Sequence, residues 1–140
     1  MKTLALILSL ILTSTLSLAQ DNTGTYSITV KVENALSNDG HMMISLHTED
    51  TFMKAKGIQS FKSEIQDGVV AVTFEDIAPG KYAIMVLHDA NDNGKMDFDT
   101  TGMPSESYGM SNNPMLFGPP TFADAKFELL NEDKEINIRF

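Results

Sequence analysis

Residues 26–33 read Tyr26-Ser27-Ile28-Thr29-Val30-Lys31-Val32-Glu33, so that every second side chain is apolar or aromatic. An alternation with a period of two is typical of a β-strand that buries one face and exposes the other. The polar side chains between them, which include Lys31 and Glu33, would lie on the exposed face. This stretch therefore predicts a half-buried strand near the start of the folded domain.

The same kind of pattern recurs along the rest of the chain. Further strands are expected over residues 41–47, 58–66, 69–74, 82–87, 125–130 and 135–140, and residues 49–57 could hold one short helical turn. Asp67-Gly68 is a favoured two-residue turn, so the strands on either side of it are expected to form a hairpin. The run from Tyr82 to Leu87 is almost continuously apolar, which indicates a central strand buried on both faces. About seven strands with almost no helix predict an all-β fold, a single antiparallel β-sandwich of immunoglobulin-like or transthyretin-like outline.

The first 19 residues have the composition of a secretory signal peptide. Lys2 gives a positive start, residues 4–12 are almost wholly apolar, and Ser17-Leu18-Ala19 places small residues where a signal peptidase reads them, so cleavage is expected before Gln20. A membrane anchor is the weaker alternative, because it needs about 20 unbroken apolar residues and polar residues interrupt this run. We expect a signal peptide over 1–19 and a β-sandwich domain over 20–140, exported to the periplasm or secreted, with no membrane insertion after cleavage.

Composition narrows the classes of partner. The chain has no cysteine, so it has neither a disulfide framework nor a lipid-acceptor cysteine. Removal of residues 1–19 takes one lysine from the 10 basic residues and none of the 19 acidic ones, which leaves 9 against 19, a net charge of −10. Such a charge disfavours nucleic acid and anionic membrane surfaces as partners. The negative net charge favours cations as partners, although acidic residues scattered over the surface can also serve solubility alone.

Residues 88–97 give the clearest indication of a chemistry. They read His88-Asp89-Ala90-Asn91-Asp92-Asn93-Gly94-Lys95-Met96-Asp97 and follow the predicted central strand directly. Counted from Asp89, oxygen-bearing side chains fall at positions 1, 3, 5 and 9, a glycine falls at position 6, and position 7 can offer its backbone carbonyl, which is the spacing of a calcium loop. The predicted ligands are Asp89, Asn91, Asn93, Lys95 and Asp97.

The loop departs from the helix–loop–helix calcium site. Thr100 stands at position 12, where that site has a bidentate glutamate, and a strand precedes the loop in place of a helix. With two carboxylates and two neutral amides, we expect a weak structural site with a dissociation constant of roughly 10⁻⁴ to 10⁻³ M. Asp99 or Glu106 would complete the ligand shell if the fold brings either one within reach.

Three other interpretations of this region stay open. Asn93-Gly94 is a strong turn dipeptide, so the loop could be a plain metal-free turn. His88 and its neighbours could bind a transition metal. Met96, Met103, Met110 and Met115 could bind Cu(I) as soft ligands, but methionine also fills irregular gaps and no tight methionine–histidine cluster accompanies them.

An ordered series of motifs, from residue 79 to residue 125, carries a resemblance that covers nearly all of the chain after residue 19. It comprises Pro79-Gly80-Lys81-Tyr82-Ala83, the loop from His88 to Asp97, Gly102-x-Pro104-x-Glu106-x-x-Gly109-x-Ser111-Asn112, and Pro119-x-Thr121-Phe122-x-x-Ala125. This series resembles an uncharacterised family of secreted bacterial proteins, domain of unknown function 2141. The resemblance implies an exported bacterial β-sandwich and supplies no activity, cofactor or partner.

Residues 99–120 contain several proline and glycine turns and no clear period, which indicates a long irregular loop of a kind that tends to be functional or disordered. The chain has no cysteine nucleophile, G-x-S-x-G elbow, phosphate loop or H-E-x-x-H motif, so we expect a non-enzyme. The predicted function is an exported binding or structural module with an unidentified extracytoplasmic partner and a calcium loop. The alternative is a small periplasmic enzyme or ligand carrier with its site under the 99–120 loop, near Tyr108, Asn112 and Phe117.

Overall fold

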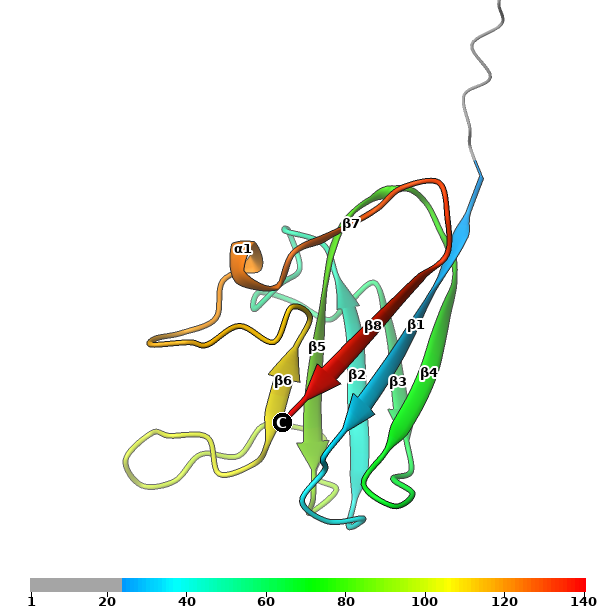
Figure 1. Cartoon of the computed structure of the whole chain (residues 1–140). Coiled ribbons are helices and arrows are strands. Elements are labelled where there is room, and N and C mark those ends of the chain that lie inside the picture. The colour runs from blue at the N-terminus through cyan, green and yellow to red at the C-terminus, as the bar shows by residue number, and fades with distance from the viewer. Residues whose placement is uncertain (1–23) are drawn as a thin grey trace, which may run out of the picture.

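The computed structural model describes residues 24–140, which form two β-sheets packed against each other (Figure 1). One sheet has the strand order β4-β1-β8, built from β1 (Tyr26–Glu33), β4 (Val70–Ile77) and β8 (Lys134–Arg139). The other has the order β3-β2-β5-β6, built from β2 (His41–His47), β3 (Gln59–Ser63), β5 (Gly80–Asp89) and β6 (Tyr108–Met110), and β7 (Phe127–Leu129) pairs with the start of β5.

The predicted all-β sandwich is confirmed, and most of its predicted strands lie where expected. Helix in the described part of the chain is limited to α1 (Phe122–Ala125), so none of its helices could span a membrane. One detail differs from a purely antiparallel sandwich, because β1 and β8 run parallel. The predicted signal peptide, residues 1–19, lies outside the described residues.

The hairpin predicted around Asp67-Gly68 is wrong. The turn itself forms, with a bridge between Gln66 and Val69, but β3 pairs with β2 and β4 pairs with β1. The chain passes from one sheet to the other between them, and Ile65 is buried at this crossing. A favourable turn sets only the local reversal, whereas the buried faces of the strands decide which neighbours they take.

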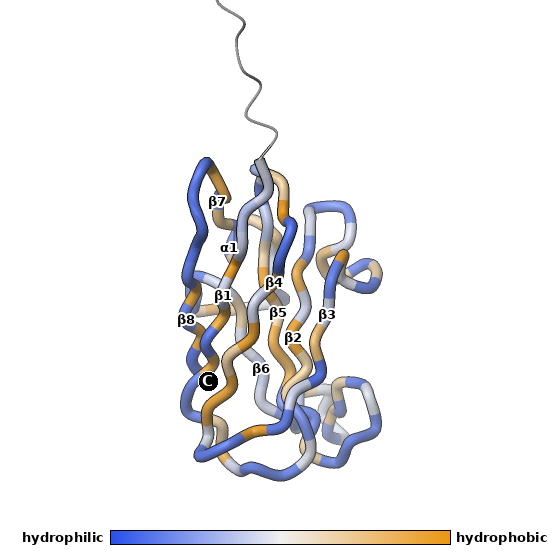
Figure 2. The backbone as a smooth tube through the Cα atoms, turned by 90° about the vertical axis from the view of Figure 1, so that its right-hand side faces the viewer, coloured by the Kyte–Doolittle hydropathy of each residue, from blue (hydrophilic) through white to orange (hydrophobic). Residues whose placement is uncertain are grey.

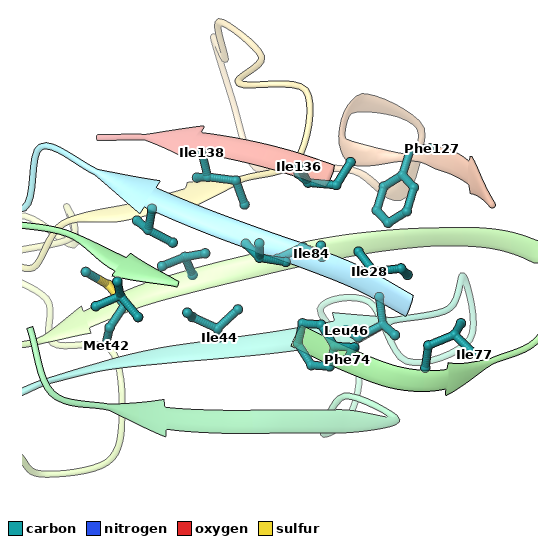
Figure 3. Packing of buried hydrophobic residues seen from close by; sticks show 14 of the residues in the cluster. Ile28, Met42, Ile44, Leu46, Phe74, Ile77, Ile84, Phe127, Ile136 and Ile138 are labelled. Atoms are coloured by element: carbon teal, nitrogen blue, oxygen red, sulfur yellow. The ribbon is translucent and has the colours of Figure 1, made fainter. Parts of the chain in front are cut away.

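The main core fills the space between the sheets (Figure 3). The alternation in β1 buries Ile28, Val30 and Val32 completely, and these meet the buried side chains of β2 and β5 from the opposite sheet. Figure 2 shows the hydrophobic segments along the strands and the hydrophilic ones at the turns. Each such side chain contributes about 1.5–3 kcal/mol on burial, so this core carries the fold without disulfides.

A second, smaller core covers the outer face of the five-stranded sheet. It consists of Phe52, Ala83, Met110 and Ala125, which come from the turn after β2, from β5, from β6 and from α1. The ring of Phe52 packs edge-on against His47 and Phe122, with centroid distances of 5.9 Å in both pairs. Because β5 is covered on both faces at this end, its sequence is almost continuously apolar, as predicted for a central strand.

His47 should make stability depend on pH. Burial lowers its pKa, and a hydrogen bond to Thr51 offsets this only in part. The unfolded chain therefore binds the proton first, so stability is complete above about pH 6.5, the ordinary histidine pKa, and decreases as pH falls below it. We expect urea unfolding to show a steeper loss between pH 7.5 and 5 for the wild type than for His47→Gln; parallel curves would contradict this role of His47.

Candidate functional site

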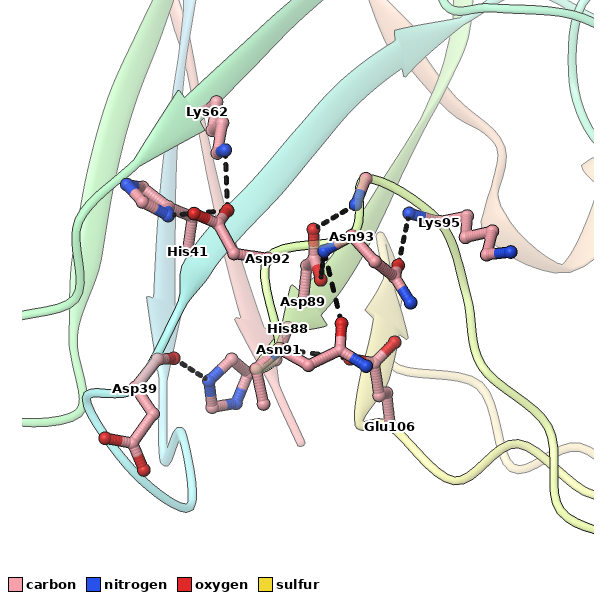
Figure 4. A network of polar contacts seen from close by, with 12 residues as sticks. Asp39, His41, Lys62, His88, Asp89, Asn91, Asp92, Asn93, Lys95 and Glu106 are labelled. Carbon is pink, nitrogen blue, oxygen red and sulfur yellow. Dashed lines mark hydrogen bonds and ion pairs between the residues drawn. The ribbon is translucent and has the colours of Figure 1, made fainter.

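The candidate calcium loop is anchored by a buried carboxylate at the end of β5. The side chain of Asp89 is fully buried. Its Oδ1 accepts a hydrogen bond from the backbone N–H of Asn93 at 3.0 Å, and its Oδ2 accepts one from Gly94 at 2.7 Å (Figure 4). These two bonds fold residues 90–94 back over the end of the strand. Asp89 is thus oriented by the loop that the calcium spacing predicted.

Three other predicted ligand residues meet at one point. The side-chain amide of Asn93 donates to both carboxylate oxygens of Asp97, at 3.0 and 2.8 Å, and the amide of Asn91 donates to its Oδ2. Hydrogen bonds from Asn93 and then Asn91, with a smaller contribution from the Lys95 charge, hold the pKa of Asp97 below its ordinary value. Asp97 is therefore anionic at neutral pH. The backbone N–H of Lys95 donates to Asn93 Oδ1 at 3.0 Å, which keeps that residue in the loop.

Of the two downstream acids considered as extra ligands, Glu106 reaches the loop and Asp99 does not. Glu106 accepts hydrogen bonds from the backbone N–H of Ala90 at 3.0 Å and of Asp97 at 3.1 Å, one on each carboxylate oxygen. It therefore ties together the two ends of the loop. Asp99 instead closes its own turn by accepting from Thr101 and Met103.

Asp92 lies within the loop sequence but forms contacts on a different side. Its Oδ1 is 2.6 Å from Lys62 Nζ and 2.9 Å from His41 Nδ1, and the hydrogen bond from Lys62 is the main reason that the pKa of Asp92 is lowered. This ion pair ties the loop to β2 and β3. This ion pair could not be predicted from the sequence, because Lys62 and His41 lie 30 and 51 residues earlier in the chain than Asp92.

His88 is occupied by contacts of its own. Its Nε2 donates to the backbone carbonyl of Asp39 at 2.8 Å, and its ring stacks on Phe140 at a centroid distance of 6.5 Å. Over residues 24–140, no three side chains of the His, Cys, Asp and Glu types gather closely enough to hold a metal ion. The calcium ligands predicted for the 89–97 loop also include amide and carbonyl oxygens.

The predicted irregular loop at 99–120 is interrupted by β6, and it is fastened on the far side by three consecutive polar residues. The hydroxyl of buried Ser111 donates to the Ala125 carbonyl and accepts from the Ile84 N–H at 2.9 Å. Asn112 donates to the carbonyls of residues 124 and 126, and Asn113 bonds both Asn137 and Arg139 of β8. The segments before and after β6 project from the sandwich on the same side of the view in Figure 1.

A shallow hollow of about 260 Å³ lies beside β6. It is lined by Tyr108, Gly109, Met110, Asn113, Pro114, Leu116 and Arg139. Of the three residues predicted to mark a site under the 99–120 loop, only Tyr108 lines it. Phe117 is almost completely exposed, and Asn112 is used in the contacts to α1 and Lys126.

The sequence pattern of a family described as an uncharacterised protein conserved in bacteria matches residues 30–137. The match runs from within β1 to within β8 and includes the whole candidate loop. The chain belongs to this family. The resemblance to domain of unknown function 2141 is thereby confirmed.

The other comparisons add little to the family assignment. No curated protein matches the chain. Among solved structures, a pilus-presented adhesin aligns with 13% sequence identity and a TM-score of 0.28, over 84% of this chain. The chain spans about a quarter of that adhesin chain, 26% of its length.

Proposed function

We propose that this member of domain of unknown function 2141 is an exported binding or structural module in which the 89–97 loop holds one calcium ion weakly. The observation that carries the proposal is the convergence of Asn91, Asn93 and Asp97 at one point, in a loop that also orients the buried Asp89. The ion would be structural, and its role would be to order the loop at the end of β5.

The oxygen atoms present fit calcium better than a softer metal. Calcium takes 6 to 8 oxygen ligands from carboxylates, amides, backbone carbonyls and water. Asp89 and Asp97 would bind through carboxylates, Asn91 and Asn93 through amide oxygens, and Lys95 through its carbonyl. Each amide oxygen accepts one N–H and keeps a second lone pair. With two carboxylates among the ligands, the affinity should lie at roughly 10⁻⁴ to 10⁻³ M.

Order in the loop would extend to the segment beyond it through Glu106. This residue binds the N–H groups at both ends of the loop and directly precedes the residue that pairs with His88. The excursion 97–105 is closed at its base by the bond from Ser105 N–H to the Asp97 carbonyl, at 2.9 Å. An ion at Asp97 would therefore stabilise the base of this excursion as well.

Calcium should raise the thermal midpoint of the wild-type protein. At about 10 mM calcium and a dissociation constant of about 10⁻³ M, binding adds about 1.4 kcal/mol to the free energy of unfolding. For a domain of this size the thermal midpoint should rise by about 5 °C over the value in chelator. Calorimetry or circular dichroism at equal ionic strength, with sodium as the reference cation, measures this shift.

Two asparagine substitutions in the same loop separate ion binding from a metal-free turn. Asp97→Asn removes a proposed ligand charge and should abolish the calcium-dependent shift. Asp92→Asn removes the same charge from a residue that pairs with Lys62 and His41 instead, and should keep the shift. If the wild-type midpoint does not move in calcium, or if both variants retain the full shift, the loop is a turn closed by hydrogen bonds alone.

Export is the second part of the proposal. It rests on the composition of residues 1–19, with Lys2 before an apolar run and Ser17-Leu18-Ala19 before Gln20. The protein recovered from a bacterial host should lie outside the cytoplasm and have Gln20 as its first residue by amino-terminal sequencing. Recovery from the cytoplasm with Met1 still present would contradict export.

A further inference from the structure

The β6 strand has an open edge. Hydrogen bonds from His88 N–H to the Ser107 carbonyl, at 2.9 Å, and from Ser111 N–H to the Ile84 carbonyl, at 3.0 Å, fix the pairing with β5. In an antiparallel pair, alternate residues direct their backbone groups toward the partner strand. Gly109 therefore faces β5, whereas Tyr108 and Met110 direct their backbone groups away from it. Met110 is buried in the second core, with 3% of its surface exposed, so it is Tyr108, a partly exposed residue, that can offer these groups to a ligand. No strand of the described residues pairs with that outer edge.

The hollow of about 260 Å³ lies along this edge and combines apolar with polar walls. Pro114 and Leu116 contribute apolar surface, and Met110, which is almost completely buried, contributes little. On the opposite wall, the Asn113 side chain bonds the Asn137 carbonyl and the Arg139 N–H, each at 2.9 Å, and so occupies the edge of β8. On the β6 side of the hollow, the N–H and carbonyl of Tyr108 have no hydrogen-bond partner among the described residues.

Arg139 supplies the charge of the hollow. It is the only arginine in a chain with 19 acidic residues, and within the described residues its guanidinium forms no ion pair or side-chain hydrogen bond. Its neighbour in register on β1 is Glu33, but that carboxylate is paired with Lys31 at 2.7 Å. Lys31 mainly, and the Arg139 charge to a smaller extent, lower the pKa of Glu33, but no hydrogen bond occupies the guanidinium N–H groups. These groups are suited to bind a carboxylate with two parallel hydrogen bonds.

We propose that this groove binds the carboxy-terminal end of an extended peptide from a partner protein. The peptide backbone would pair with the outward N–H and carbonyl of Tyr108, the partly exposed residue of β6, as in strand addition to a sheet edge, and the terminal carboxylate would bind Arg139. This site is separate from the candidate calcium loop and goes beyond the function proposed above.

Two features favour a chain end over a continuous strand. The Met110 carbonyl already accepts the Asn113 N–H, at 3.2 Å, so the turn at 110–113 closes the edge and an added strand cannot continue past it. The hollow is also smaller than the roughly 300–1,000 Å³ of typical small-molecule pockets. A short terminal segment with one anchoring carboxylate fits such a space.

The test uses the protein with an untagged carboxy terminus and a mixture of N-acetylated tetrapeptides that end in Ala, Val, Leu or Phe. In ¹H–¹⁵N NMR spectra, millimolar peptide should shift the backbone amides of Tyr108 and Met110 in a saturable way. The same peptides with amidated carboxy termini should bind at least about tenfold more weakly, as should the free acids to Arg139→Gln, because a charge-assisted pair is lost. Lys134→Gln, which removes the same charge from the other end of β8, should bind like the wild type.

Three results would overturn the proposal. The first is the absence of shifts at Tyr108 and Met110 with millimolar free-acid peptides. The second is equal binding of acids and amides, which would leave no role for a terminal carboxylate. The third is an equal effect of sodium acetate at the same concentration, which would indicate an anion site without peptide recognition.

Discussion

Substitution of Gly40 by alanine should lower the free energy of unfolding by at least about 3 kcal/mol, the range of a severe single-site effect. Gly40 has φ +65°, and a Cβ built on it would lie 2.0 Å from the Asp89 carbonyl oxygen and 2.8 Å from backbone atoms of Ala90. Backbone atoms on a paired strand cannot move aside as a flexible side chain can. The clash would fall at the point where β5 ends and the candidate calcium loop begins.

Gly102→Ala provides the matched control. Gly102 also has a positive φ, +83°, but nothing lies within 4 Å of a Cβ built there. The free energy of unfolding of this variant should therefore fall only by the left-handed backbone strain, about 1–2 kcal/mol. Urea unfolding of both variants, compared through midpoints at an unchanged m-value, isolates the clash. Equal losses for the two variants would show that the contact between Gly40 and Asp89 is not tight.

The strands that the sequence predicts well are those whose pattern reflects purely local geometry. Ile28, Val30 and Val32 alternate with polar residues because β1 has one buried and one exposed face. The run from Tyr82 to Leu87 is apolar because β5 has cores on both sides, with Ile84 in one and Ala83 in the other. In both cases the side-chain period alone identifies the environment.

Pairing and short strands could not be predicted in the same way. Asp67-Gly68 indicates a turn, but the choice of β2 for β3 and of β1 for β4 depends on residues far away in the sequence. The strand β6 contains only three residues, Tyr108-Gly109-Met110, which is too short to display a period. Residues 108–110 form a strand because they pair with the edge of β5. The sequence around them shows no strand pattern.

The same distinction between local pattern and long-range contacts applies to the candidate site. Spacing alone predicted that Asn91, Asn93 and Asp97 would share one loop with Asp89, because all four lie within nine residues. Which downstream acid reaches that loop depends on how the excursion 97–105 closes. The three-dimensional structure was therefore needed to show that Glu106 contacts the loop and Asp99 does not.

Several residues in the family motifs have structural roles that the sequence did not reveal. Gly109 allows close approach of β8, because a Cβ there would lie 2.8 Å from Ile138. Thr121 caps α1 by a reciprocal pair of hydrogen bonds with Asp124. Ala125, the last residue of α1, is fully buried. These motif positions hold the segment after β6 against the sandwich.

Ser111→Ala should cost about 2–4 kcal/mol, because it leaves two buried backbone groups without partners. Ser111 is completely buried between β5 and the end of α1. Its hydroxyl accepts from the Ile84 N–H and donates to the Ala125 carbonyl. Because Ser111 is completely buried, removal of its hydroxyl would leave both backbone groups without a partner in the interior, where an unsatisfied polar group is costly.

Ser45→Ala tests whether this loss comes from burial and not from the substitution of serine itself. The Ser45 hydroxyl also has a side-chain partner, Ser60 at 2.9 Å, but that pair is exposed and water can replace the lost contact. Its free energy of unfolding should change by no more than about 0.5 kcal/mol. Ser111→Ala should also increase hydrogen exchange at the Ile84 amide relative to Ser45→Ala, because that amide loses its acceptor. If both variants are equally stable, the Ser111 hydroxyl does not fasten the segment after β6 to β5 and α1.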